Sequence, residues 1–165
     1  MCSSDLIAAA LSAAAATAAE TGKPARLLVV TVTTGFRHGS INTAEPVLEE
    51  LGRTSGLFHP DYLRMPPDRP PAPKAPKRAD GTSDADWKKQ EEAFKEEQAK
   101  HRVADTAWQE GLKQQFTKAF SAESLAAFDG VIFANTTGEL PIPDMDAFLA
   151  WIKTGKAFIG MHAAT

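Results

Sequence analysis

The sequence has little cysteine and no strong excess of charge. Its single cysteine is Cys2, near the N-terminus. A domain folded from the rest of the chain therefore forms no disulfide, holds no metal through cysteine and has no thiolate nucleophile. The 18 Lys and Arg residues oppose 21 Asp and Glu residues, which gives a net charge of −3. This balance excludes a general attraction to nucleic acid or anionic lipid.

The sequence also has no apolar run near the roughly 20 residues that span a bilayer. The Ala-rich stretch at residues 6–19 instead resembles the hydrophobic region of a secretory signal peptide, with small residues suited to cleavage before Glu20. The start, MCSSDL, has no Lys or Arg, and we interpret it as non-native sequence read from a sequencing adapter. An Ala-rich helix or tail is the alternative. We predict a signal peptide over residues 1–22 and a periplasmic or extracellular protein.

Apolar, β-branched runs alternate with helical patterns from residue 26 onward. A run broken by Pro60 predicts a weak strand at residues 57–63. Continuous apolar runs predict two buried strands, at residues 26–33 and 130–134, and a fourth strand is predicted at residues 156–161. The alternation of strands and helices predicts an α/β domain over residues 23–165, with a parallel sheet and right-handed crossovers.

Helical spacing of apolar residues predicts the helices between these strands. The first begins at residue 41, ends at Gly52 or Gly56, and places these residues on one face: Ile41, Ala44, Val47, Leu48 and Leu51. A short helix at residues 121–128 precedes the third strand. The last helix, residues 144–153, is predicted to face inward with Met145, Phe148, Leu149 and Ile152.

Residues 66–120 stand apart from this alternation. The segment from Met65 to Arg78 carries six of the 11 prolines and predicts an extended linker. The rest, from Asp84, predicts one helix or two segments broken near His101. Its charged middle alternates in sign, which favours a solvated helix face over a basic binding patch. We interpret residues 66–120 as a Pro-rich and helical insertion.

Three polar loops leave the predicted strands at residues 34–40, 135–139 and 162–165. Parallel strands share their carboxyl edge, where ligands bind in open α/β sheets. The loops are therefore expected to lie together. Two of them carry a histidine, His38 and His162, whereas His59 and His101 lie outside this set and are interpreted as structural.

The text around these loops resembles the ThuA-like (trehalose utilisation) family. The matching segments are VVTVTTGFRHGSI, FDGVIFANTTGEL and GKAFIGMHAAT, in that order. The resemblance implies a fold similar to class I glutamine amidotransferases, a flavodoxin-like three-layer α/β sheet. It also implies a role in carbohydrate catabolism, on trehalose, related disaccharides or their 3-keto derivatives. Since the family pattern continues past HAAT, we expect the domain to be an N-terminal fragment cut off after its fourth strand.

The resemblance also sets a limit on the chemistry. In the amidotransferase relatives a cysteine nucleophile follows the strand that corresponds to residues 158–161, and here that position is His162. An imidazole can act as a base, an acid or a metal ligand, but it cannot form a thioester. We therefore predict that the protein is not a glutamine amidotransferase.

His38 and His162 are the predicted catalytic residues. With a flavodoxin-like strand order their backbones lie about two strand spacings apart, roughly 10 Å, which two imidazoles can bridge onto one substrate. The same pair is a candidate for binding a divalent metal, although catalytic zinc sites normally use three protein ligands. A third would have to come from residues after Thr165.

Polar residues near the histidines are predicted to bind the substrate. Arg37 can grip hydroxyl groups or an anion, or form a surface ion pair. Asn135, Thr136 and Thr137 suit sugar hydroxyls, and the alternative for them is turn chemistry around Gly138. Glu139 is either an acid or base, or a solvated loop residue.

Three functions remain open from the sequence. The first is an exported enzyme that processes a small carbohydrate by histidine-based acid/base or metal-assisted chemistry. The second is a non-catalytic carbohydrate-binding module of a larger secreted protein. The third is a phosphate binder that uses Gly35, Gly39 and Ser40 before a helix, although the loop has no GxGxxG or GxxxxGK pattern.

Overall fold

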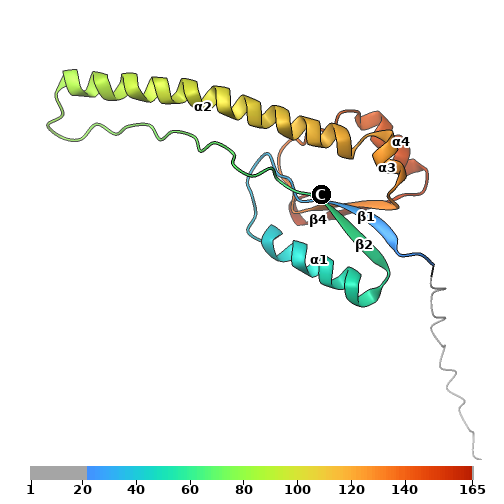
Figure 1. The fold of residues 1–165 in the computed structure, drawn as a ribbon. Helices are drawn as coiled ribbons and strands as arrows, with labels where there is room; N and C mark the ends of the chain where they lie inside the picture. The colour runs from blue at the N-terminus through green and yellow to red at the C-terminus, as the bar shows by residue number, and fades with distance from the viewer. Residues whose placement is uncertain (1–21, 165) are drawn as a thin grey trace, which may run out of the picture.

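The computed structural model describes residues 22–164. Cys2 and the predicted signal peptide, apart from Gly22, lie outside these residues. Four strands form one sheet: β1 (Ala25–Val30), β2 (Phe58–Leu63), β3 (Gly130–Ala134) and β4 (Ala157–Met161). All neighbours are parallel and the order is β2-β1-β3-β4. The predicted α/β fold, with its flavodoxin-like order, is confirmed (Figure 1).

Helices cover both faces of this sheet, which makes three layers. Helix α1 (Ile41–Ser55) lies on one face, and α2 (Asp84–Ala119), α3 (Ala122–Ala126) and α4 (Met145–Lys153) lie on the other (Figure 1). Along β1, Leu27 and Val29 pack with Leu48 of α1, whereas Leu28 and Val30 face the opposite core. Since both faces are buried, β1 and β3 read as continuous apolar runs.

Helix α1 ends at Gly56, which adopts a φ of +64°, one of the two ends predicted. The other candidate, Gly52, lies inside the helix, where a Cβ atom would approach Phe58 O to 2.8 Å. This glycine lets α1 lie close against β2. Val47 and Leu51, predicted on the apolar face, are instead 47% and 50% exposed, because they lie at the flank of the helix that the sheet does not cover.

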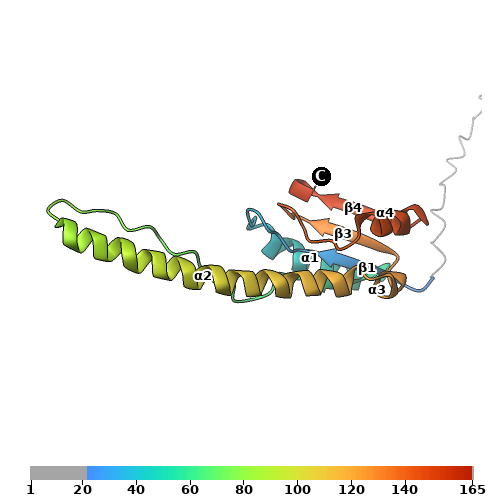
Figure 2. The same cartoon turned by 90° about the horizontal axis from the view of Figure 1, so that it is seen from above.

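Helix α2 is one continuous helix, not two segments. Nothing at His101 breaks it, and the His101 ring contacts the Pro-rich segment, with Nε2 3.1 Å from Pro70 O. That segment runs back along α2 (Figures 1 and 2). Three of its half-buried prolines, Pro70, Pro73 and Pro76, recur every third residue, which fits a polyproline helix. The predicted linker is thus extended but docked.

The C-terminal part of α2 belongs to the core of the domain. Leu112 and Phe116 are 3% and 0% exposed, and Phe120 follows them at 6%. Phe120 stacks on Phe116 at 5.5 Å between ring centroids and meets Phe148 of α4 edge-on at 5.1 Å. The segment predicted as an insertion therefore supplies the helix that covers the second face of the sheet.

Helix α4 covers its part of the sheet only partly. Phe148 is buried as predicted, but Met145 and Leu149 are 49% and 44% exposed. Phe158 of β4 is 52% exposed as well. These side chains line an open pocket described below, so they face the core side without being covered. Across residues 22–164, no helix has the length and apolar character needed to cross a membrane.

Candidate functional site

The loops that follow β1, β3 and β4 meet at the carboxyl edge of the sheet. β3 lies between β1 and β4, with Val30 opposite Phe133 and Ala134 opposite Met161. The first loop carries His38, the second begins at Asn135, and the third is a 3₁₀ turn, η1 (His162–Ala164). The expectation that the three loops share one edge is confirmed.

The two predicted catalytic histidines are in contact. The ring centroids of His38 and His162 are 4.9 Å apart, with an angle of 69° between the ring planes. Phe36 packs edge-on against His38, with 5.0 Å between the centroids. His38 is half-buried and His162 is exposed, so one imidazole is held by its neighbours while the other faces solvent.

The backbone turns sharply where β3 and β4 end. Asn135 and His162 directly follow these strands, and both have a positive φ, +55° and +54°. Residues other than glycine rarely adopt this conformation, and Asn and His do so more readily than most. Such strained positions concentrate at functional sites. The backbone conformation supports the choice of His162 over an ordinary turn residue.

Two threonines join the loops after β1 and β3. Thr33 Oγ1 and Thr137 Oγ1 lie 2.5 Å apart, and the Thr137 hydroxyl also donates to Phe36 O at 2.6 Å. Thr34 N and Gly35 N both donate to Thr137 O, at 3.0 and 3.1 Å. The Thr137 hydroxyl therefore fixes the loop that leads to His38, and its contact with a substrate stays a prediction.

The other residues predicted to bind the substrate differ in their exposure and in their hydrogen-bond partners. Arg37 is exposed, and its guanidinium donates to Thr31 O and Asn42 Oδ1, each at 3.4 Å. Asn135 and Thr136 are each 5% exposed. Glu139 is exposed, and its backbone oxygen accepts a hydrogen bond from Thr34 Oγ1 at 2.8 Å. Only Asn135 directly adjoins the strand end beside His162, since Asn135 N donates to Met161 O.

A carboxylate that the sequence analysis missed lies near the end of β1. Glu45 accepts hydrogen bonds from Thr31 Oγ1 at 2.6 Å and from Arg64 Nε at 2.7 Å. Burial opposes ionisation of Glu45, but these hydrogen bonds and the charges of Arg64 and Arg37 together lower its pKa. The signal for this cluster was Thr31, a hydroxyl within an otherwise apolar strand run.

His38 and His162 are the predicted metal ligands at this edge of the sheet. Within residues 22–164, no three His, Cys, Asp or Glu side chains lie close enough together to hold an ion. The two histidines alone are fewer ligands than a zinc site normally uses. The described residues by themselves therefore do not supply the ligand set of a catalytic zinc site.

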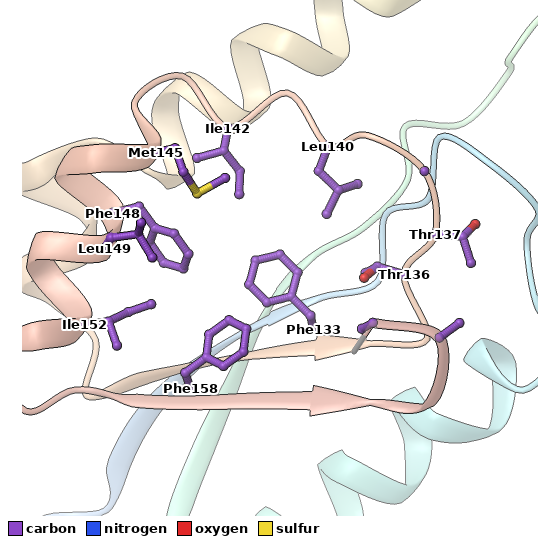
Figure 3. A pocket seen from close by; sticks show the side chains of 13 residues that line it. Phe133, Thr136, Thr137, Leu140, Ile142, Met145, Phe148, Leu149, Ile152 and Phe158 are labelled. Carbon is purple, nitrogen blue, oxygen red and sulfur yellow. The ribbon is translucent and has the colours of Figure 1, made fainter.

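A pocket of about 620 Å³ opens next to these loops, between α4 and β4 (Figure 3). Thr136 and Thr137 lie at one end of it. The other end is apolar, with side chains from β3, α4 and β4, and it includes Phe133, Met145, Phe148, Leu149, Ile152 and Phe158. The exposure of Met145, Leu149 and Phe158 follows from their place on its wall.

Gly138 provides a test of how the loops position the histidines. It has a φ of +78°, and a Cβ atom there would lie 2.5 Å from Gly35 N and from Thr34 Oγ1. Gly138→Ala should lower the free energy of unfolding by roughly 1–3 kcal/mol, measured by urea denaturation. Gly39→Ala, whose Cβ would meet no atom within 4 Å, is the control and should stay within about 0.5 kcal/mol of wild type. Equal losses of the free energy of unfolding in both variants would show that the loops after β1 and β3 do not depend on the close contact at Gly138.

Glu45 provides a test of stability against pH. Its pKa is lowered from 4.5 in the folded protein, so the stabilisation is complete at pH values above 4.5 and is lost as pH falls through the lower, folded pKa. Glu45→Gln should therefore be less stable than wild type at pH 7 and lose less stability on acidification. Glu96→Gln, on an exposed part of α2, should follow the wild-type curve. Parallel wild-type and Glu45→Gln curves from pH 7 to pH 3 would contradict this role.

The comparisons with known proteins agree with this arrangement. The family model for trehalose utilisation, ThuA, matches residues 26–165, which include both site histidines and the four strands except Ala25, the first residue of β1. Neither the curated proteins nor the solved structures compared with this chain gave a match. The chain belongs to the ThuA (trehalose utilisation) family.

Proposed function

We propose that this protein processes a small carbohydrate, a disaccharide or its 3-keto derivative, with His38 and His162 as an acid/base pair. The observation that carries the proposal is the 4.9 Å contact between their rings at the carboxyl edge of the sheet. Histidine is the side chain whose charge changes near neutral pH. An imidazole can serve as a general base or as a general acid, so a pair of them can supply both roles of acid/base catalysis.

A 3-keto sugar is a substrate on which such a pair can carry out acid/base catalysis. The keto group acidifies the neighbouring C–H bond, so the neutral imidazole can remove that proton. The electron pair of the C–H bond then forms a C=C bond, and the keto oxygen takes a proton from the other imidazolium as it becomes an enol hydroxyl. The histidine that acts as the base ends protonated and the one that acts as the acid ends neutral, so no other reactant is needed. Asn135, beside His162, and Arg37 supply polar groups for the sugar hydroxyls.

Substitution of each histidine tests the proposal. His38→Ala and His162→Ala should each abolish turnover or binding of a 3-keto disaccharide. The melting temperature should stay nearly unchanged for His38→Ala, whose ring is only half-buried, and should fall for His162→Ala, because alanine tolerates the positive φ of position 162 poorly. His162→Asn is a second variant, because asparagine tolerates the positive φ at this position. It should keep the fold and still lose activity.

His59→Ala is the matched control for these variants. His59 is an exposed histidine of β2 and should be silent. Normal turnover by both His38→Ala and His162→Ala would overturn the proposal. Binding without turnover in the wild-type protein, with no dependence on the histidines, would instead identify a carbohydrate-binding module.

We also propose that the protein is exported, with a small-molecule carbohydrate as its partner. The support is the Ala-rich run at residues 6–19 and the small residues before Glu20. Expressed with a native start in a bacterial host, the chain should be cleaved near Ala19 and be found outside the cytoplasm, as measured by mass spectrometry of cell fractions. An intact N-terminus in the cytoplasmic fraction would contradict export.

A further inference from the structure

A second, polar pocket lies between the insertion and the loops of the site. Its volume is about 340 Å³. One wall comes from the docked Pro-rich segment and α2, and the other comes from the loops after β1 and β3. The polar and aromatic lining residues are Arg69, Trp108, Gln109 and Lys113 on the first wall, and Thr34 and Glu139 on the second.

The wall formed by the insertion is held in place by interactions of its own. The Arg69 guanidinium lies over the Trp108 ring, 4.9 Å from its centroid, and Arg69 Nε lies 3.2 Å from Asp105 Oδ1. Trp108 Nε1 donates to Pro67 O at 3.2 Å, and Gln109 Nε2 donates to Asp105 Oδ2 at 2.6 Å. These contacts fix the side chains before any ligand arrives, which lowers the entropic cost of binding.

The opposite wall belongs to the loops that hold the histidine pair. Thr34 Oγ1 donates to Glu139 O at 2.8 Å, so the loops after β1 and β3 are tied together at the pocket. Thr34 precedes His38 by four residues, and Glu139 follows Asn135 by four. A ligand in this pocket would thus contact the same two loops that carry the proposed reaction.

The charges of the pocket favour a neutral ligand. Arg69 and Lys113 are cationic, and each lies beside a carboxylate, Asp105 and Glu110. Glu139 on the wall is a further anion, so there is no excess of positive charge. Such a site does not select an anion. It does offer both donors and acceptors, which is what a hydroxyl group needs because it donates and accepts at once. Trp108 and Leu112 add apolar atoms to the lining, and the Arg69 guanidinium covers one face of the Trp108 indole.

We propose that this pocket is a second carbohydrate subsite, which binds a neutral sugar unit of the substrate while another unit reacts at the histidine pair. The inference rests on the proposed carbohydrate function and deepens it. It assigns to the insertion a role in substrate selection: disaccharides gain from the subsite, and monosaccharides do not.

Tryptophan NMR on the full chain tests the subsite directly. Trehalose is the probe, and the Trp108 indole N–H signal is assigned with Trp108→Phe. Trehalose should shift this signal and leave that of Trp87 unchanged, because Trp87 lies 21 residues earlier on α2, about 30 Å away along the helix. Glucose should shift the Trp108 signal only at much higher concentration.

A substitution supplies the second measurement. Lys113→Ala should weaken trehalose affinity about tenfold, the effect of losing one charged hydrogen-bond donor, and should not change glucose affinity. Lys95→Ala, on a distant exposed part of α2, is the control and should bind trehalose as wild type does.

The outcomes separate this inference from the proposed function. Histidine-dependent turnover or binding of the sugar without any shift at Trp108 would overturn the subsite and leave the proposed function standing. A Lys113-dependent shift at Trp108 in a protein whose histidines are dispensable would support the subsite and overturn the proposed function. A shift caused by inorganic phosphate and not by trehalose would overturn the assignment to a neutral sugar.

Discussion

The contact between the backbones at Gly35 and Gly138 determines where the histidines lie. His38 follows β1 and His162 follows β4, and β3 lies between these strands. About 10 Å would separate the two positions if each loop rose straight from its strand. The close approach of the two glycines, with Thr137 O accepting two backbone hydrogen bonds, ties the first loop to the loop that follows β3. His38 belongs to this first loop, and its ring contacts that of His162.

At this edge of the sheet, the residue type matches the backbone conformation at Asn135 and His162. The hydrogen bond from Asn135 N to Met161 O extends the pairing of β3 and β4 up to the turn, and Asn135 then leaves the sheet with a positive φ. His162 likewise leaves the sheet with a positive φ, at the end of β4. Since Asn and His are among the few side chains that tolerate this conformation, both positions combine a sharp turn with a polar side chain. Alanine would satisfy neither requirement.

Much of the fold and the pairing of the histidines could be predicted from the sequence. Continuous apolar runs identify strands buried on both faces, and parallel strands bring their following loops to one edge. The features that could not be predicted from the sequence depend on contacts between residues far apart in the chain. Periodicity assigned Leu51 and Leu149 to apolar faces, but it cannot tell how far the sheet extends beneath each helix. Likewise, composition predicts an extended Pro-rich segment but not its docking on α2, and no local pattern brings Arg64 to Glu45.

The long helix α2 shows why the insertion cannot be separated from the domain. A crossover from β2 to β3 needs a helix on the face that α1 leaves uncovered, and Leu112 and Phe116 at the end of α2 fill that place. The rest of the helix continues rigidly from this anchored end. Trp108 precedes Leu112 by about one turn, so the same apolar packing that completes the sheet also fixes the polar wall beside the site loops. Packing in the core thereby contributes to the geometry of the second pocket, together with the contacts among Arg69, Trp108 and Asp105 that hold its wall.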